Sequence, residues 1–332
     1  MKLAALCLLA TVASAGGAHA DTLQQVLKRG YLRCAIVDGV PGFSVLQNDG
    51  SRVGFMADNC RAISAALFAQ SKIEYIAISP AAGLTLLQAG SVDVFPGGAT
   101  WTFSRDAALG LDYTGVYLYT GQGFAVRRSR HIQHVSDLDG ATICLMQGTT
   151  SEQNVADYFR AHGLRYSVLS FSDIERAFHA YLSDRCDAFS TEQISLASRL
   201  SALPERGAHV VLPELITTEP YAALVRQGDP RWRKIVWWIF SVRVLAEELG
   251  ITSANIDTVR ATSKNLEVRR LLGAEGAFGE KLGLPDDWAY QVIKSGGNQR
   301  ELWERHFAHF GVERDLNRLW SDGGLMMSMP FR

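Results

Sequence analysis

The sequence predicts an α/β protein with two parallel-sheet regions followed by a helical C-terminal part. Short apolar strands alternate with helices twice along the chain, the pattern changes at Glu219-Pro220, and from Pro230 to the C-terminus only helical patterns recur. Strands separated by single helices form parallel sheets with right-handed crossovers. The chain has 332 residues, of which 47% are hydrophobic, enough for two domains with large cores.

The first 20 residues have the pattern of a secretory signal peptide. Lys2 provides a positive start, residues 3–12 are apolar, and Ala18-His19-Ala20 is a small-x-small cleavage site. The apolar run is too short to span a bilayer, and Cys7 lies inside it rather than after a cleavage site, which argues against a lipid anchor. We expect export, with cleavage after Ala20.

The first series of elements follows the leader. Gly30 ends its first helix, and Asp58 is the predicted N-cap of its second. The predicted elements, in order, are a helix over 22–30, a strand over 31–37, a helix over 59–70, a strand over 72–79, a helix over 81–90 and a strand over 91–95.

The second series begins after residue 121 and leads into the helical part. Its predicted strands cover 123–127, 141–146, 166–170 and 188–190, with helices over 152–162 and 174–183. The later helices are predicted over 230–249, 256–263, 267–272, 286–294 and 300–310. The most apolar stretch, IVWWIFSV over 235–242, is flanked by basic residues and is far below spanning length, so we predict a core helix.

The cysteine count favours disulfides. Five cysteines are present, and removal of the leader leaves Cys34, Cys60, Cys144 and Cys186. An even number in an exported chain indicates disulfides, and four cysteines allow three pairings. We predict Cys34–Cys60 and Cys144–Cys186, because each pair lies within one series. Four buried free thiols are the alternative.

Composition and motifs argue against several classes of function. The 33 basic and 34 acidic side chains balance, which is untypical of an electrostatic nucleic-acid binder. HExxH, GxSxG, P-loop, dinucleotide-binding and CxxC patterns are all absent from the sequence. His131 and His134 form an HxxH that is typical of a solvated surface pair. We therefore expect no catalysis, no metal and no cofactor.

The stretch 91–106, SVDVFPGGATWTFSRD, is the main candidate for a binding site. Its predicted strand breaks at Pro96-Gly97-Gly98 and is followed by Thr100, Trp101 and Arg105. Open α/β sheets bind ligands at the carboxyl ends of their strands, and a Pro-Gly-Gly break leaves N–H groups free for an anion. The pattern favours capture of a small carboxylate; a strand-to-helix connection with a surface arginine is the alternative.

Two further strand ends carry polar groups. Gly148-Thr149-Thr150 leads into a predicted helix whose N-terminus could hold an anion, although ordinary N-capping gives the same pattern. Glu192 lies at the end of DAFSTEQ and could hold an ammonium group, or be a solvated loop carboxylate. Phe43 and Trp101 could wall a cavity or belong to the core.

Motifs spread over the mature sequence carry a family resemblance. They are CRA (60–62), TWTFSRD (100–106), ALGLDYTGVYLY (108–119), GQGFAVR (121–127), LDGATIC (138–144), GTTSE (148–152), RCDAFSTEQ (185–193), AEELGITSANID (246–257), RRLLGAEGAFGEKLGL (269–284) and DWAY (287–290). With these motifs in this order, the chain resembles periplasmic solute-binding proteins of polar amino acid ABC importers, and within them the general L-amino-acid-binding subfamily.

The resemblance implies a two-lobe, Venus-flytrap α/β fold with two hinge strands, each lobe a mixed sheet flanked by helices. Lobe one would comprise residues 21–121 and the helical return 222–332, and lobe two residues 122–221. It also implies a periplasmic monomer that takes up an amino acid ligand and docks on the membrane permease of an ABC importer. A periplasmic dehydratase or a ligand sensor on the same fold is the alternative.

The resemblance also implies roles for the candidate residues. Arg105 would pair with the ligand carboxylate, Thr100 and Thr150 would add hydrogen bonds, and Glu192 would hold the ammonium group. Phe43, Trp101 and the bare backbone at Gly98 would meet the rest of the ligand.

The sequence departs from the subfamily pattern at three places. Gly97, Gly98 and Ala99 stand where polar side chains are usual, and Glu192 stands where an aspartate is usual. A third departure, Met56 in place of a common acid, is expected to concern only the entrance of its helix.

Overall fold

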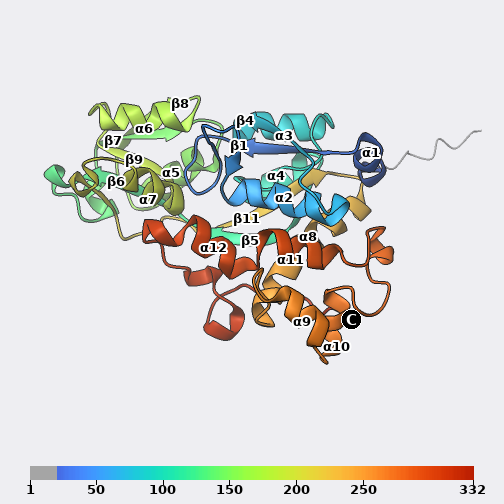
Figure 1. The fold of residues 1–332 in the computed structure, drawn as a ribbon. Coiled ribbons are helices and arrows are strands. Elements are labelled where there is room, and N and C mark those ends of the chain that lie inside the picture. Colours follow the sequence, from blue (N-terminus) through green and yellow to red (C-terminus); the bar gives the residue numbers. More distant parts are fainter. Residues whose placement is uncertain (1–20) are drawn as a thin grey trace, which may run out of the picture.

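The structure is a computed structural model, and it describes residues 21–332. The predicted signal peptide, with Cys7, lies outside the described residues. In Figure 1 the green and yellow-green middle of the chain lies to the left, the blue first part to the upper right, and the orange and red C-terminal helices below it.

The first part contains a small parallel sheet. Strand β1 (Leu32–Val37) pairs with β4 (Ile73–Ile78) in parallel, with Cys34 opposite Tyr75. The predicted strand over 91–95 is wrong as a regular element, because Val94 and Phe95 form only single bridges, to Cys34 and Leu224. The helices are α1 (Thr22–Arg29), α2 (Phe55–Phe68), α3 (Pro80–Gln88) and α4 (Phe103–Ala108), and a short hairpin joins β2 (Val45–Leu46) to β3 (Arg52–Val53).

Helix α2 begins before its predicted start at residue 59, because backbone carbonyls replace a side-chain cap. The N–H groups of Phe55 and Met56 donate to the carbonyl oxygens of Gly42 and Phe43, at 2.8 and 2.9 Å. Donors at a helix start need such partners when they are buried. The loop around residues 42–43 is thereby tied to the first turn of α2.

Asp58, the predicted cap, is instead a buried anchor between α2 and the C-terminal part. Its Oδ2 atom lies 2.6 Å from both Arg305 Nη1 and His306 Nε2. Burial disfavours the charged carboxylate, but the hydrogen bond with His306 and the charge of Arg61 outweigh burial and hold the pKa of Asp58 well below its usual range. The carboxylate therefore stays charged.

Two long strands join the first part to the middle of the chain. Strand β5 (Leu111–Thr120) pairs with β11 (Glu219–Arg226) in antiparallel fashion, with Thr120 opposite Glu219. The chain leaves β5 at Gly121, enters the middle part, and returns to β11 through residues 212–218. The local sequence pattern predicts neither strand; the resemblance implies two hinge strands but gives no bounds for them.

The middle part is a five-stranded sheet in the order β10-β6-β9-β7-β8. Strand β7 is parallel to β8 and β9, whereas β6 is antiparallel to β9 and to β10, so the sheet is mixed. The strands are β6 (Gln122–Arg127), β7 (Ala141–Met146), β8 (Tyr166–Phe171), β9 (Ala188–Glu192) and β10 (His209–Val211); the helices are α5 (Thr150–Ala161), α6 (Ile174–Leu182) and α7 (Gln193–Ser201).

The C-terminal part is helical, as predicted. Helix α8 (Pro230–Glu248) buries Ile235, Val236 and Ile239, which confirms the predicted core helix. Among the described residues no helix is long and apolar enough to cross a membrane. The remaining helices are α9 (Ile256–Thr262), α10 (Leu266–Leu271), α11 (Trp288–Gly296) and α12 (Gln299–His306).

Side chains of the C-terminal part hydrogen-bond to the backbone of β5. The Asn317 side chain accepts from the N–H of Tyr119 at 2.7 Å and donates to its carbonyl at 2.8 Å. Gln299 Nε2 donates to the carbonyl of Tyr117, also at 2.8 Å. The C-terminal part therefore supplies polar partners that a neighbouring strand would otherwise provide.

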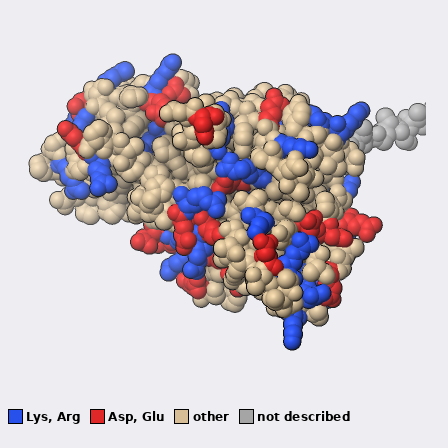
Figure 2. Space-filling view, in the orientation of Figure 1, with Lys and Arg blue, Asp and Glu red and all other residues tan. Residues whose placement is uncertain are grey.

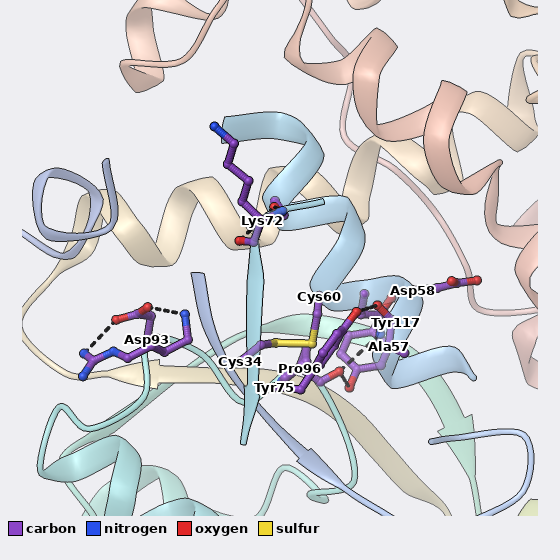
Figure 3. The surroundings of a disulfide bond; sticks show 12 residues. Cys34, Ala57, Asp58, Cys60, Lys72, Tyr75, Asp93, Pro96 and Tyr117 are labelled. Atoms are coloured by element: carbon purple, nitrogen blue, oxygen red, sulfur yellow. Dashed lines mark hydrogen bonds and ion pairs between the residues drawn. A yellow bond between two sulfur atoms is a disulfide. The ribbon is translucent and has the colours of Figure 1, made fainter. Parts of the chain in front are cut away.

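Both predicted disulfides are confirmed. Cys34–Cys60 ties β1 to α2, and Cys144–Cys186 ties β7 to the turn before β9. Figure 3 shows the first bond beside Pro96, which belongs to the stretch 91–106, and beside Tyr117 of β5, whose hydroxyl donates to the Pro96 carbonyl.

A continuous core runs from β1 and α2 across β5 and β11 to α8, and it extends to one face of the five-stranded sheet at Ala125, Cys144 and Phe189. A smaller core covers the other face of that sheet around Phe124, Ile143 and Phe159. On the face in Figure 2, basic and acidic side chains are interspersed rather than separated. This face offers no large region of a single charge.

Candidate ligand-binding site

A cavity of about 60 Å³ lies where β1, β9 and β11 end or begin. It is lined from the first part, from the middle part and from β11. Among its lining residues are these predicted site residues: Phe43, Gly98, Thr100, Arg105, Thr150 and Glu192. The chain thus brings together groups that are separated by up to 149 positions in sequence, as the numbers of Phe43 and Glu192 show.

Arg105 supplies the positive charge of the cavity. It lies in α4, where its N–H donates to the Thr102 hydroxyl at 3.3 Å. Its Nη1 atom donates to the carbonyl of Thr100 at 3.1 Å, and Tyr113 Oη donates to the same carbonyl at 2.8 Å. No acidic side chain of residues 21–332 lies within salt-bridge distance of Arg105. The guanidinium can therefore pair with an anion from outside the chain.

Glycine is needed at positions 97 and 98 because the side chain of Met56 lies close to both. A Cβ atom at Gly97 would lie 2.9 Å from Met56 Cγ, and one at Gly98 would lie 2.8 Å from Met56 Cε. Gly98 also has a φ of +77°, which favours glycine. Met56 is buried and lines the cavity, so the expectation that it concerns only the helix entrance is wrong. The side chain of Met56 fills space that side chains at 97 and 98 would need.

The N-terminus of α5 forms part of the opposite wall. Thr149 is its N-cap and accepts from the N–H of Ser151 at 3.2 Å, so the N-capping interpretation holds locally. Thr149, Thr150 and Ser151 also line the cavity. Thr149 can therefore cap α5 while the first residues of the helix face the cavity.

Glu192 contributes a carboxylate on the same side. It ends β9 and precedes α7, and its Oε2 atom accepts from the Thr191 hydroxyl at 2.5 Å. Within residues 21–332 no other side chain hydrogen-bonds to this carboxylate. Glu192 is thus a carboxylate at the cavity with capacity to accept further donors.

Glu219, a second acid at the cavity, was not predicted. Its Oε2 atom accepts from Thr100 Oγ1 at 2.9 Å, and its Oε1 atom accepts from Asn154 Nδ2 at 2.6 Å. Burial raises the pKa of Glu219, the hydrogen bond from Thr100 lowers it, and the charge of Glu192 raises it again; the net direction is upward. In the sequence Glu219 stands only at a change of pattern, and no local signal marks its carboxylate as part of a site.

Trp101 does not reach the cavity. Its ring stacks on Tyr113, with centroids 5.0 Å apart and planes at 9°. Its backbone N–H donates to the carbonyl of Pro220. Phe43, in contrast, is buried against Phe307 and also lines the cavity. Trp101 therefore supports the segment between Gly98 and Arg105 rather than the cavity wall.

The family assignment follows from sequence similarity over most of the chain. Residues 32–249 match the family "Bacterial extracellular solute-binding proteins, family 3". The chain belongs to this family. Among relatives of this solute-binding protein is the glutamate/glutamine/aspartate/asparagine-binding protein BztA of Rhodobacter capsulatus, 41% identical over 96% of this chain and 95% of the relative. The general L-amino acid-binding periplasmic protein AapJ of Rhizobium johnstonii is 39% identical over 96% and 95%.

A solved structure is also similar to this solute-binding protein. It is an ABC transporter periplasmic binding protein from Brucella ovis with glutathione bound, 42% identical, with a TM-score of 0.92. The match covers 95% of this chain and 100% of that one. The solute-binding fold therefore extends through the C-terminal part, beyond the residues of the family match.

Proposed function

We propose that this solute-binding protein captures an L-amino acid or a similar small zwitterion in the periplasm and delivers it to an ABC importer, without catalysis. The observation that carries the proposal is one cavity that holds Arg105 on one side and Glu192 on the other. A zwitterion needs opposite charges at opposite ends of a site shielded from water. The amino-acid-binding relatives support the same conclusion.

In this proposal Arg105 pairs with the α-carboxylate and Glu192 with the α-ammonium group. The third charged group, Glu219, already accepts hydrogen bonds from the chain. The ligand side chain then meets Val37, Val40 and Met56, which are apolar. An uncharged side chain is expected there, because an unpaired charge against an apolar wall is costly.

The two crossings between β5 and β6 and between β10 and β11 suggest how a ligand is enclosed. We assign residues 21–121 and 222–332 to one lobe and residues 122–221 to the other, with the crossings as hinges. Since the cavity is lined from both lobes, a ligand would favour the closed arrangement by contacting both at once. The closed form would then dock, as a monomer, on the membrane permease.

Isothermal titration calorimetry tests this function. The mature protein is titrated with the twenty standard L-amino acids and with glutathione, which occupies the similar Brucella ovis structure. We expect binding of at least one L-amino acid, with uncharged side chains preferred over those of lysine, arginine, aspartate and glutamate. Failure of every α-amino acid to bind would reject the proposal.

A further inference from the structure

We propose that Glu219 is a positioning residue that makes the hydroxyl groups of Thr100 and Thr150 hydrogen-bond acceptors toward the ligand. Together with Glu192 they would form a subsite that selects an ammonium group. This inference rests on the proposed capture of an amino acid, and it specifies which part of the ligand hydrogen-bonds to the two threonines.

Glu219 lies where all parts of the site meet. It is the first residue of β11, is only 5% exposed and lines the cavity. Its carboxylate contacts Thr100 from the first part and Asn154 and Thr150 from α5. One side chain therefore holds groups from both sides of the cavity.

The inventory of donors and acceptors fixes the direction of these bonds. An ionised carboxylate only accepts hydrogen bonds, and a hydroxyl has a single proton to donate. In the ionised state of Glu219, Thr100 Oγ1, which lies 2.9 Å from Glu219 Oε2, therefore donates to it. The Thr150 hydroxyl lies 3.3 Å from Glu219 Oε1 and 3.5 Å from Thr100 Oγ1, whose own proton is already engaged. The Thr150 hydroxyl therefore donates its proton to Glu219 Oε1 or to Thr100 Oγ1, and not toward the ligand.

A second set of bonds holds the carboxylate in place. Asn154 Nδ2 donates to Glu219 Oε1 at 2.6 Å and to Gln122 Oε1 at 2.9 Å. Gln122 Nε2 in turn donates to Ser190 Oγ at 2.8 Å. Because the amide of Asn154 points its protons at two acceptors, it cannot turn round without losing both bonds.

The consequence for a ligand is a division of roles. With their protons engaged, Thr100 and Thr150 offer only lone pairs, which attract an N–H donor and repel a carboxylate oxygen. Glu192 adds a negative charge to the same cavity. The ligand carboxylate is left to Arg105 and to backbone N–H groups, so a carboxylic acid without an amine should be rejected.

The substitution Glu219→Gln reverses one of these bonds while preserving shape. The new amide would accept from Asn154 through its oxygen and donate to Thr100 through its nitrogen. Thr100 would then have to direct its own proton elsewhere, including toward the ligand. The matched control is Glu304→Gln, which removes an exposed carboxylate from α12.

The test compares amino acids with their deaminated analogues at pH 8, by calorimetry: L-leucine with 4-methylpentanoate, and L-glutamine with 4-carbamoylbutanoate. The wild-type protein and Glu304→Gln should prefer the amino acid of each pair equally strongly. Glu219→Gln should lose about tenfold of that preference, the size expected for one redirected hydrogen bond. Equal weakening of both members of a pair, with the melting temperature unchanged, would overturn the proposal, because a merely structural role predicts it.

Neutron crystallography of the deuterated wild-type protein supplies a readout that needs no ligand. The deuteron of the Thr100 hydroxyl is expected on the line to Glu219, and that of Thr150 on the line to Glu219 or Thr100. Deuterons that point into the cavity would overturn the inference. If neither L-leucine nor L-glutamine binds the wild-type protein, this measurement alone decides the role of Glu219, while the panel of amino acids decides the proposed function.

Discussion

The two sides of the cavity differ in chemistry. The side from the first part presents Val37, Val40, Phe43 and Met56, with Arg105 as its charged group. The side from the middle part presents mostly hydroxyl groups and the carboxylate of Glu192. In the proposed binding mode the first side would set the shape available to a ligand side chain and would hold one anion, whereas the second would offer many polar partners.

This difference also suggests how the two sides can change independently. Apolar walls discriminate by size, and each methylene changes affinity only modestly. Polar groups discriminate more strongly, because a buried donor or acceptor without a partner is costly. We therefore expect polar substitutions on either side to change affinity, and apolar ones on the first side to change ligand preference.

The largest expected effect is the loss of the cation from the first side. Arg105→Ala should weaken amino acid binding by about 3 kcal/mol, or more than a hundredfold, because the ligand carboxylate would be desolvated without a partner. Arg105→Lys should recover only part of this loss, since an ammonium group cannot bind a carboxylate in bidentate fashion.

Calorimetry of both variants measures the effect. Arg128→Ala, at an exposed arginine that donates to the carbonyl of Gly207, is the control for loss of a positive charge. Unchanged affinity in Arg105→Ala would remove this residue from the site.

The next effect concerns the acid of the second side. Glu192→Gln should weaken binding by about 2 kcal/mol, because the ammonium group would lose a charged partner while shape is kept. Its affinity for the deaminated analogue should change much less. Titration with L-leucine and 4-methylpentanoate checks this contrast, and a parallel loss for both compounds would contradict the assigned role.

A smaller effect is expected at the contact between Gly97 and Met56. Gly97→Ala should lower the free energy of unfolding by about 1.5 kcal/mol, because its Cβ would press on Met56. Adding Met56→Ala should relieve the clash, giving a favourable coupling of about 1 kcal/mol in a double-mutant cycle. Urea denaturation of the four proteins measures it; additive losses would show that the two positions do not compete for space.

The smallest expected effect is the difference in stability lost when each of the two disulfides is removed. Cys34–Cys60 closes a sequence separation of 26 and Cys144–Cys186 one of 42. Chain entropy predicts that replacing the longer-range pair by serines costs about 0.4 kcal/mol more than replacing the other. Denaturation curves of the two double-serine variants give this difference, and an equal or reversed order would mean that packing around the bonds outweighs loop length.

Much of the fold was predictable because it depends on local patterns. Helical spacing and apolar runs identified α1, α8 and most strands of the middle sheet, and the pairing of Cys144 with Cys186 followed from their place in one series. The start of α2 was not predictable in this way, because its donors are satisfied by carbonyls of the preceding loop, at Gly42 and Phe43. The segment 91–95 lacks regular strand pairing because it bridges two different sheets.

The candidate site was predictable in part for a similar reason. Arg105, Thr150 and Glu192 lie at or after the ends of predicted strands and carry suitable groups, so local reasoning could select them. Glu219 gives no such signal, since its importance arises from partners that precede it by 119 and 65 positions, Thr100 and Asn154. The role of Met56 likewise depends on its contact with the glycines of a distant segment.

The side-chain amide of Asn317 has a consequence for behaviour at high concentration. The outer edge of a β-strand is a template on which a strand of a second molecule can pair, and proteins protect such edges in various ways. At Tyr119 one amide occupies both the N–H and the carbonyl of β5. Edge-to-edge aggregation is thereby blocked at this point by a residue from the far end of the chain.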